Sequence, residues 1–382
     1  MDTSGNMGNL RVLFQGRHHI LSNWGGDTTL ALKTKEQLER LGIQVDVSVR
    51  ADVNLSPYDF VHIFGVRFWS FYYHCFLNAR RQGKRVVLSP IFWDVTSTTS
   101  VSERNRLLKK VYGLIPLSIR ARITRRRYQL TDADLQSVKH WIQVNTRPVP
   151  PPNERYREMF SGSAVLLVNS RIEKDRLLSM FPVATPCIVV HNAVDPMFFD
   201  PDPSWFVREY GLKDFILCVA WLSEHKNQLM AIKALRNAPA PVVFIGGAVS
   251  KSYARKCRAE ADSDMHFIGP LPQEKLASAY AAARVHVLAS LYEIPGLVSL
   301  EAALAGCAVV TTKDGSTTEY FEDMVEYCDP HDMDSIRSAT LRALEKGPDP
   351  RLREHVAKNF TWERVAKETL EGYKLAALRL ED

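Results

Sequence analysis

The chain has 382 residues with 46% hydrophobic and 24% charged residues, which is typical of a globular protein with roughly two to three domains. No apolar run reaches the about 18 residues of a membrane-spanning helix, and the polar N-terminus does not resemble a signal peptide, so we expect an intracellular protein. The formal charge is +10 over residues 1–200 and −4 over residues 201–382, which predicts an anionic partner for the N-terminal half.

Short apolar runs alternate with helix-compatible segments through the first half of the chain. The run at residues 10–16 predicts the first strand, and Gly25 and Gly26 precede the helix that follows it. A glycine pair at this position lets the backbone approach a phosphate or a sugar closely, although the same pair also fits a simple turn. Further strands are predicted at residues 44–49, 60–65, 85–93, 164–170 and 187–195.

The pattern restarts after residues 195–205, a segment rich in proline and aromatic residues that is the best linker candidate. Because strands and helices alternate, each half is expected to form a parallel sheet with right-handed crossovers. We therefore predict an α/β protein with two Rossmann-like doubly wound domains facing a cleft, at residues 1–198 and 199–361, and a helix at 362–382 that crosses back to the first domain. The second set of strands is predicted at residues 215–221, 241–247, 265–270, 285–290, 307–312 and 325–330.

Residues 285–312 form the strand, loop, helix and strand of one βαβ unit, with Glu293 in the loop and Glu301 in the helix. Ligands bind where the carboxyl end of a parallel strand meets a helix N-terminus, and the free N–H groups there favour phosphate. Carboxylates are compatible with such a site when they accept hydrogen bonds from neutral hydroxyls. A sugar ring and a ribose supply such hydroxyls.

The sequence EIPGLVSLEAALAG from Glu293 to Gly306 resembles the E-x7-E signature of retaining family 4 glycosyltransferases, which have the GT-B fold. The NAVD sequence at Asn192 to Asp195 is similar to that family's NGVD. The resemblance implies that Glu293 holds the donor sugar, that Glu301 holds the nucleotide ribose, and that the backbone from Gly296 through Leu297 to Val298 holds the diphosphate.

Four more residues take donor-binding roles by the same resemblance. Gly25 and Gly26 would face the donor diphosphate, and Ile268 would flank the nucleobase. Glu319 corresponds to a glutamate on the nucleotide side, but an acidic residue in a first helical turn also stabilises its own helix dipole.

Lys226 matches the family's lysine, which stabilises negative charge on the departing diphosphate. Lys226 and Glu293 are therefore the expected catalytic residues. The position of the family's arginine holds Trp221 instead, so a second cation has to come from elsewhere. Arg17 and His225 are the candidates.

The sequence also departs from the family after residues 85–93, where relatives often carry a histidine. Asp94 is the nearest polar substitute, and His18 lies close to the glycine pair, so both are candidate acceptor residues. His62 lies within an apolar strand and is expected to be a core residue. We assign no general base, since the departing phosphate oxygen can take the acceptor's proton.

The segment 104–127 contains nine Lys or Arg residues and no acidic residue, interleaved with Leu, Val, Tyr and Ile. This composition predicts an amphipathic segment that binds an anionic membrane surface. A solvated helical hairpin over the acceptor cleft is the alternative. Nucleic acid is not expected, because the segment has too few aromatic residues to form a stacking platform.

The resemblance implies a retaining hexosyltransferase that moves a sugar from a nucleotide diphosphate sugar to a hydroxyl of a glycan or lipid-linked glycan, in polysaccharide biosynthesis. The alternative is a catalytically impaired homologue that binds nucleotide sugar as a partner or regulatory subunit. No cofactor and no metal are expected, and the location is cytoplasmic or peripheral at the inner face of the membrane. The six cysteines form no C-x-x-C pair and are expected to be buried thiols: Cys75, Cys187, Cys218, Cys257, Cys307 and Cys328.

Overall fold

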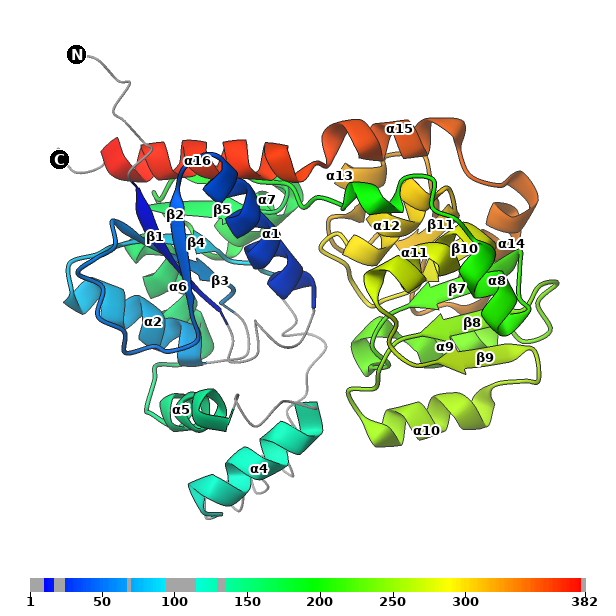
Figure 1. The fold of residues 1–382 in the computed structure, drawn as a ribbon, viewed down its shortest axis with the longest axis horizontal. Helices are drawn as coiled ribbons and strands as arrows, with labels where there is room; N and C mark the ends of the chain where they lie inside the picture. The colour runs from blue at the N-terminus through cyan, green and yellow to red at the C-terminus, as the bar shows by residue number, and fades with distance from the viewer. Residues whose placement is uncertain (1–9, 17–24, 67–69, 94–114, 129–134, 379–382) are drawn as a thin grey trace. The chain divides into compact units, whose positions relative to one another are not determined.

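The structure is a computed structural model that describes residues 10–16, 25–66, 70–93, 115–128 and 135–378. The chain divides into two compact units, Met1–His191 with Val365–Asp382, and Asn192–Arg364. Each unit contains a parallel six-stranded sheet with helices (Figure 1). The predicted α/β architecture of two doubly wound parallel sheets is therefore confirmed.

The sheet of the first unit has the order β2-β1-β3-β4-β5-β6. Its inner strands β3 and β5 are fully buried, as expected where helices cover both faces of a parallel sheet, whereas the edge strand β2 is partly exposed. The strands are β1 (Arg11–Gln15), β2 (Gln44–Ser48), β3 (Phe60–Phe64), β4 (Arg85–Ser89), β5 (Val165–Val168) and β6 (Cys187–Val189). The helices are α1 (Gly26–Arg40), α2 (Ser70–Arg81), α4 (Leu117–Tyr128), α5 (Leu135–Asn145), α6 (Pro152–Gly162), α7 (Arg171–Met180) and most of α16 (Trp362–Leu378).

The sheet of the second unit has the order β12-β11-β10-β7-β8-β9. Its strands are β7 (Phe215–Val219), β8 (Val242–Ile245), β9 (Met265–Ile268), β10 (Ala283–Leu288), β11 (Ala308–Thr312) and β12 (Glu326–Cys328). The helices are η2 (Pro196–Phe198), α8 (Ser204–Tyr210), η3 (Glu224–Lys226), α9 (Gln228–Ala234), α10 (Lys251–Glu260), α11 (Gln273–Ala282), α12 (Leu297–Ala305), α13 (Thr317–Phe321), α14 (Met333–Lys346) and α15 (Pro350–Asn359).

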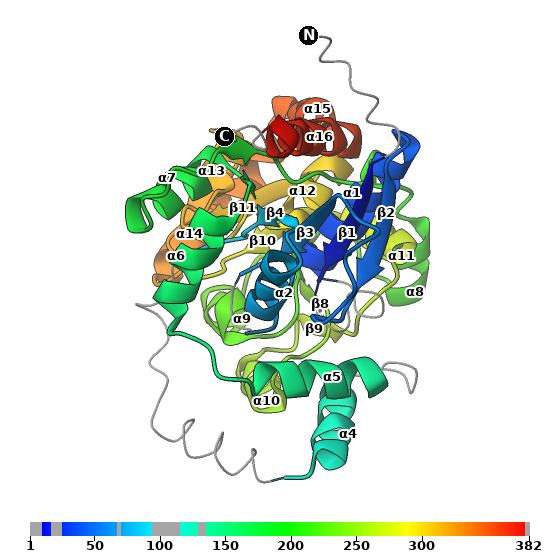
Figure 2. The same ribbon diagram turned by 90° about the vertical axis from the view of Figure 1, so that its left-hand side faces the viewer.

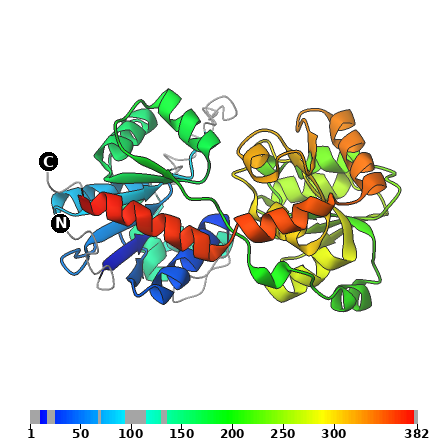
Figure 3. The ribbon, with the colours of Figure 1, turned by 90° about the horizontal axis from the view of Figure 1, so that it is seen from above.

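Helix α16 lies along the first unit, although it follows the second unit in the sequence (Figure 3). The Tyr373 hydroxyl is 2.9 Å from Nδ1 of the buried His62, and Arg85 donates to the carbonyl of Ala376 at 2.9 Å. A Cβ on Gly372 would lie 2.6 Å from Leu167 Cδ2, so the helix backbone packs directly on β5. These contacts make α16 part of the first unit's core.

His62 is a core residue, as the sequence predicts. Its Nε2 lies 2.9 Å from the hydroxyl of Ser89, and burial lowers the pKa of its imidazole to about 3. The six cysteines are free thiols. Burial raises the pKa of Cys218 and of Cys307 to about 12, while Cys187 is only half-buried.

Candidate functional site

The loop after β10 holds Glu293 by its backbone. Glu293 N–H donates to the carbonyl of Asp314 at 2.8 Å, and Ser316 N–H donates to the carbonyl of Glu293 at 2.8 Å. Gly315 between them has a φ of +116°, and a Cβ there would lie 1.8 Å from the Glu293 carbonyl oxygen. The loop after β11 therefore fixes the position of Glu293, and this fit requires glycine at position 315.

Lys226 ends the short helix η3, which follows β7. The next residue, Asn227, has a φ of +57°, and its side-chain amide donates to the carbonyls of Ala289 at 3.0 Å and Pro330 at 2.7 Å. Leu291 N–H donates to the carbonyl of His225 at 2.9 Å. Loops after β7, β10 and β12 are thus joined at the carboxyl edge of the sheet.

Within these joined loops, Lys226 Nζ lies 2.5 Å from Glu293 Oε1. The Lys226 side chain is 24% exposed and the Glu293 side chain 5% exposed. The two predicted catalytic residues therefore form one ion pair, with the cation on its accessible side.

Helix α12 begins beside this pair. Gly296 precedes the helix with a φ of +86°, and a Cβ there would lie 3.1 Å from Glu293 Oε2. Among the described residues, no side chain caps this helix, so first-turn amides at Leu297 and Val298 are suited to bind an anion. The diphosphate position that the resemblance implies thus coincides with a helix N-terminus next to a lysine.

Glu301 lies in the same helix, and its Oε2 accepts a hydrogen bond from the hydroxyl of Tyr280 at 2.9 Å. Burial raises the pKa of the Glu301 carboxyl to about 7, the charge of Asp195 also raises it, and the Tyr280 bond acts in the opposite direction. Glu301 is therefore close to its titration midpoint at neutral pH.

Trp221 follows β7, at the same edge of the sheet as Lys226. Its ring packs on the backbone of Gly247, since a Cβ at that glycine would lie 2.4 Å from Trp221 Cζ3. The residue remains 37% exposed. A fixed, half-exposed indole thus occupies the sequence position where the resemblance predicts an arginine. The candidate cation His225 packs its ring on Tyr292, with centroids 4.2 Å apart.

The remaining predicted residues are more dispersed. Ile268 ends β9 and Glu319 lies in the first turn of α13, and both are half-buried in the second unit. Gly25 and Gly26 begin α1 in the first unit. The candidates Arg17, His18 and Asp94 lie outside the described residues. The structure therefore brings together Lys226, Glu293, Gly296, Leu297, Val298 and Glu301.

Sequence reasoning missed two supporting residues, Tyr280 and Gly315. Tyr280 is a single polar aromatic residue in the alanine-rich segment ASAYAAA, which suggests a hydroxyl in need of a partner, but that partner is 21 residues away. Gly315 is in the turn sequence KDGS, which predicts a tight turn. The sequence gives no sign that this turn supports Glu293.

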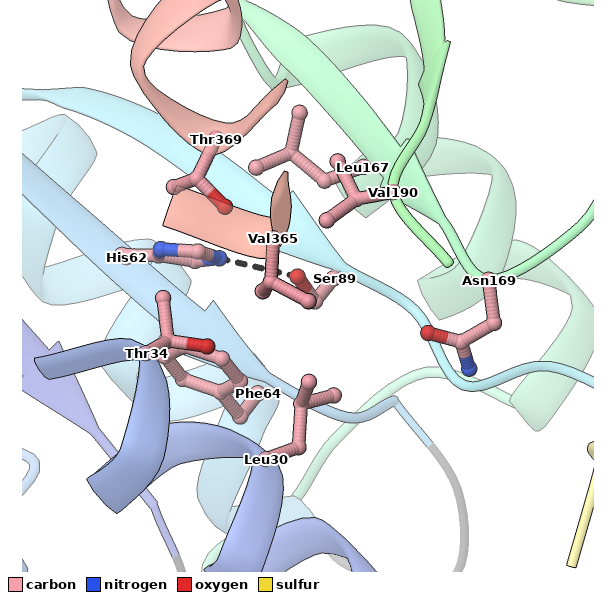
Figure 4. A pocket seen from close by; sticks show the side chains of 10 residues that line it. All are labelled: Leu30, Thr34, His62, Phe64, Ser89, Leu167, Asn169, Val190, Val365 and Thr369. Carbon is pink, nitrogen blue, oxygen red and sulfur yellow. Dashed lines mark hydrogen bonds between the residues drawn. The ribbon is translucent and has the colours of Figure 1, made fainter. Parts of the chain in front are cut away.

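The first unit contains a small cavity at the carboxyl ends of β3, β4 and β5, against α1 and α16 (Figure 4). It is large enough for a single water molecule. Thr34 Oγ1 is buried there without a hydrogen-bond partner among the described residues. The lining residues are Leu30, Thr34, His62, Phe64, Ser89, Leu167, Asn169, Val190, Val365 and Thr369.

Comparison with known proteins adds a family match for the second unit. Residues 205–361 match the model for glycosyl transferases group 1. An uncharacterised glycosyltransferase of Methanocaldococcus jannaschii is 28% identical over 246 residues, which are 58% of this chain and 62% of that protein. O-antigen chain mannosyltransferase B of Escherichia coli is 35% identical over 125 residues, 31% of this chain and 32% of that protein. Each match spans less than two thirds of the relative's own length.

Two solved structures resemble almost the whole chain. Sucrose-phosphate synthase from Thermosynechococcus elongatus has a TM-score of 0.73 at 16% identity, over 97% of this chain and 100% of that one. HepE from Anabaena, in complex with UDP and glucose, has a TM-score of 0.67 at 14% identity, over 95% of this chain and 99% of that one. At such identities the likeness concerns the fold. The chain thus has the two-domain fold of the GT-B glycosyltransferases, and residues 205–361 match the group 1 glycosyl transferases.

Proposed function

We propose that this protein is a retaining glycosyltransferase that moves a sugar from a nucleotide diphosphate sugar to a hydroxyl of a glycan or lipid-linked glycan. The observation that carries the proposal is the Lys226–Glu293 pair at the start of α12, with Glu301 in the same helix. The match of residues 205–361 and the UDP complex of a structural neighbour support a nucleotide sugar as donor.

In the proposed reaction, Lys226 and the first-turn amides of α12 bind the diphosphate and stabilise the charge that grows on it as the glycosidic bond breaks. The acceptor oxygen forms its bond to the anomeric carbon on the face from which the phosphate leaves. The acceptor's proton moves to the departing phosphate oxygen, so the step needs no separate base. Glu293 accepts hydrogen bonds from the donor sugar.

Glu301→Ala tests the division of roles between the two glutamates. A hydrogen bond to a charged acceptor contributes about 1.5 to 3 kcal/mol, so this variant is expected to bind nucleoside diphosphates (UDP, GDP or ADP) at least tenfold more weakly in calorimetry. Glu293→Ala should instead lower turnover and leave the affinity for the free nucleotide nearly unchanged. Equal losses of binding in the two variants would contradict this division.

Trp221 favours a second candidate function, a nucleotide-sugar-binding subunit with little catalytic activity, because it replaces a cation with a neutral ring. The two candidates differ in what the purified protein does without a partner. A transferase should hydrolyse its donor slowly when no acceptor is present. Binding of nucleotide sugar with no hydrolysis and no transfer would support the subunit instead.

We also propose that the acceptor is lipid-linked and that residues 104–127 dock on an anionic membrane surface. Residues 104–114 of this segment lie outside the described residues, and most of the rest forms α4. Ile119 and Ile123 are 47% and 44% exposed and lie one turn apart, whereas Ala121 and Thr124 are buried. Helix α4 packs against α5 (Figures 1 and 2), so one face of α4 is covered while its isoleucines remain accessible. Among the described residues, no helix is both long and apolar enough to cross a bilayer.

Reversing the charges of Arg125 to Arg127 with glutamate should abolish flotation with phosphatidylglycerol vesicles, since each cation near such a surface contributes about 1 kcal/mol. Binding of the unaltered protein should also weaken as salt increases. The matched control reverses three exposed cations of the second unit, Arg208, Arg255 and Lys256, and should still float. A protein that ignores these vesicles at low salt would refute membrane docking.

A further inference from the structure

Tyr280 is a buried tyrosine of the second unit whose hydroxyl contacts the candidate nucleotide site. The residue is 0% exposed, and its ring packs edge-to-face on Phe198 of η2, with centroids 5.8 Å apart, and on His286 of β10 at 6.0 Å. The ring is therefore packed among its neighbours, and its hydroxyl donates to Glu301 Oε2 at 2.9 Å.

The hydrogen bond from Tyr280 determines which carboxylate oxygen of Glu301 is fully available to a ligand. Glu301 remains partly exposed in α12. Tyr280 takes one acceptor site of Oε2, so Oε1 is the oxygen that keeps both of its acceptor sites for hydroxyl donors. A charged acceptor with one fixed partner also loses less side-chain freedom when it binds a second.

We propose that Tyr280 is a positioning residue for the nucleotide: it holds the Glu301 carboxylate in one orientation, with Oε1 as the acceptor for the ribose hydroxyls. This inference rests on the proposed function, which places the ribose at Glu301, and it adds the residue that prepares Glu301 for that ribose. Tyr280 itself is buried and acts through Glu301 alone.

Other titratable groups surround this pair. Asp195 accepts a hydrogen bond from Met197 N–H at 3.1 Å, and its negative charge acts on Glu301. Burial lowers the pKa of His286 to about 3 and raises that of Tyr280 well above its usual 10.

Two further groups lie at the C-terminal end of α12. Burial raises the pKa of Cys307 to about 12, and its thiol donates to the carbonyl of Tyr280 at 3.1 Å. Arg353 of α15 donates to the carbonyl of Ala305 at 3.0 Å. Among these groups with shifted pKa values, Glu301 is the one that titrates between pH 6 and 9, because its pKa is about 7.

Removing the Tyr280 hydroxyl should raise the pKa of Glu301. The Tyr280 bond lowers the pKa of Glu301, so in Tyr280→Phe that pKa is higher and the ionised carboxylate forms at a higher pH. The ionised form is the stronger acceptor. Nucleotide affinity should therefore rise with pH through about 7 in the unaltered protein, and this rise should move to higher pH in the variant.

The experiment measures dissociation constants for UDP, GDP or ADP, whichever binds most tightly, from pH 6 to 9. Tyr280→Phe is expected to bind five- to tenfold more weakly at pH 7, with a smaller deficit at pH 9. Tyr373→Phe is the matched control, because it removes another fully buried, hydrogen-bonded tyrosine hydroxyl but in the first unit. It should leave both the affinity and its pH dependence unchanged. The ligand's own titration is common to all variants and cancels in their ratios.

A double variant shows whether Tyr280 acts through Glu301. In the Glu301→Gln background, Tyr280→Phe should cause no further loss of affinity. Suppose that Glu301→Gln weakens binding. If Tyr280→Phe then has no effect on affinity, or weakens binding equally with Glu301 and with Gln at position 301, the positioning role is wrong and the proposed function stands. If Glu301→Gln leaves affinity unchanged, the ribose assignment fails and the inference fails with it.

Discussion

Lys226→Ala is expected to lower the rate of donor turnover by about 100- to 1,000-fold, the usual effect of removing one preorganised group that stabilises charge in a transition state. Lys226 is the expected cation for the leaving diphosphate, and its Nζ already lies 2.5 Å from Glu293 Oε1. Steady-state kinetics of donor hydrolysis or transfer measure the change. Lys233→Ala, which removes an exposed lysine of the neighbouring helix α9, should retain full activity.

Lys226→Ala should also lower the stability of the protein, because it leaves the nearly buried Glu293 without its cation. Breaking such a pair can cost about 3 to 5 kcal/mol of stability, whereas replacing both partners is often close to neutral. Lys226→Met combined with Glu293→Gln should therefore recover the melting temperature but not the activity. If the double variant is stable and turns over donor at the original rate, the pair has no catalytic role.

The second large effect is expected for Gly315→Ala. A Cβ at this position would lie 1.8 Å from the carbonyl oxygen of Glu293 and 2.7 Å from its nitrogen, so the backbone of one of the two loops has to move. A positive φ adds about 1 to 2 kcal/mol and overpacking about 1 to 3 kcal/mol. Denaturant unfolding should therefore show a loss of about 2 to 5 kcal/mol, together with lower turnover because Glu293 is displaced.

Gly347→Ala separates the cost of the positive φ from the cost of the steric contact. Gly347 also has a positive φ, +72°, but a Cβ there meets nothing within 4 Å. This variant should show the conformational cost alone and keep its activity. If both alanine variants lose the same small amount of stability, the contact between Gly315 and Glu293 does not constrain the loop.

The strands were predictable from sequence because a parallel sheet buries both faces, so that inner strands are short apolar runs such as FILCV in β7 or VVFI in β8. Helix α16 was predictable as a helix from its apolar spacing. The hydrogen bond between its Tyr373 and His62 joins residues 311 positions apart. No local pattern encodes a partner at that distance.

The candidate site was predictable as a set of residue types but not as an arrangement. Glu293 and Lys226 were assigned separate roles on the donor, while the structure pairs them across 67 residues. The Tyr280–Glu301 bond was missed because the two residues lie in different helices, 21 positions apart. Sequence spacing reports neighbours along one element, whereas these contacts depend on which loops meet at the sheet edge.

Because α16 completes the core of the first unit, the order of folding during synthesis should differ from the order of the sequence. Residues 192–364 form a unit whose strands and helices are contiguous, so it can fold as soon as it has emerged. The first unit still lacks Tyr373, the partner of His62, at that moment. A ribosome-bound chain that has not yet released its last helix should therefore carry a protease-resistant second unit and a protease-sensitive first one.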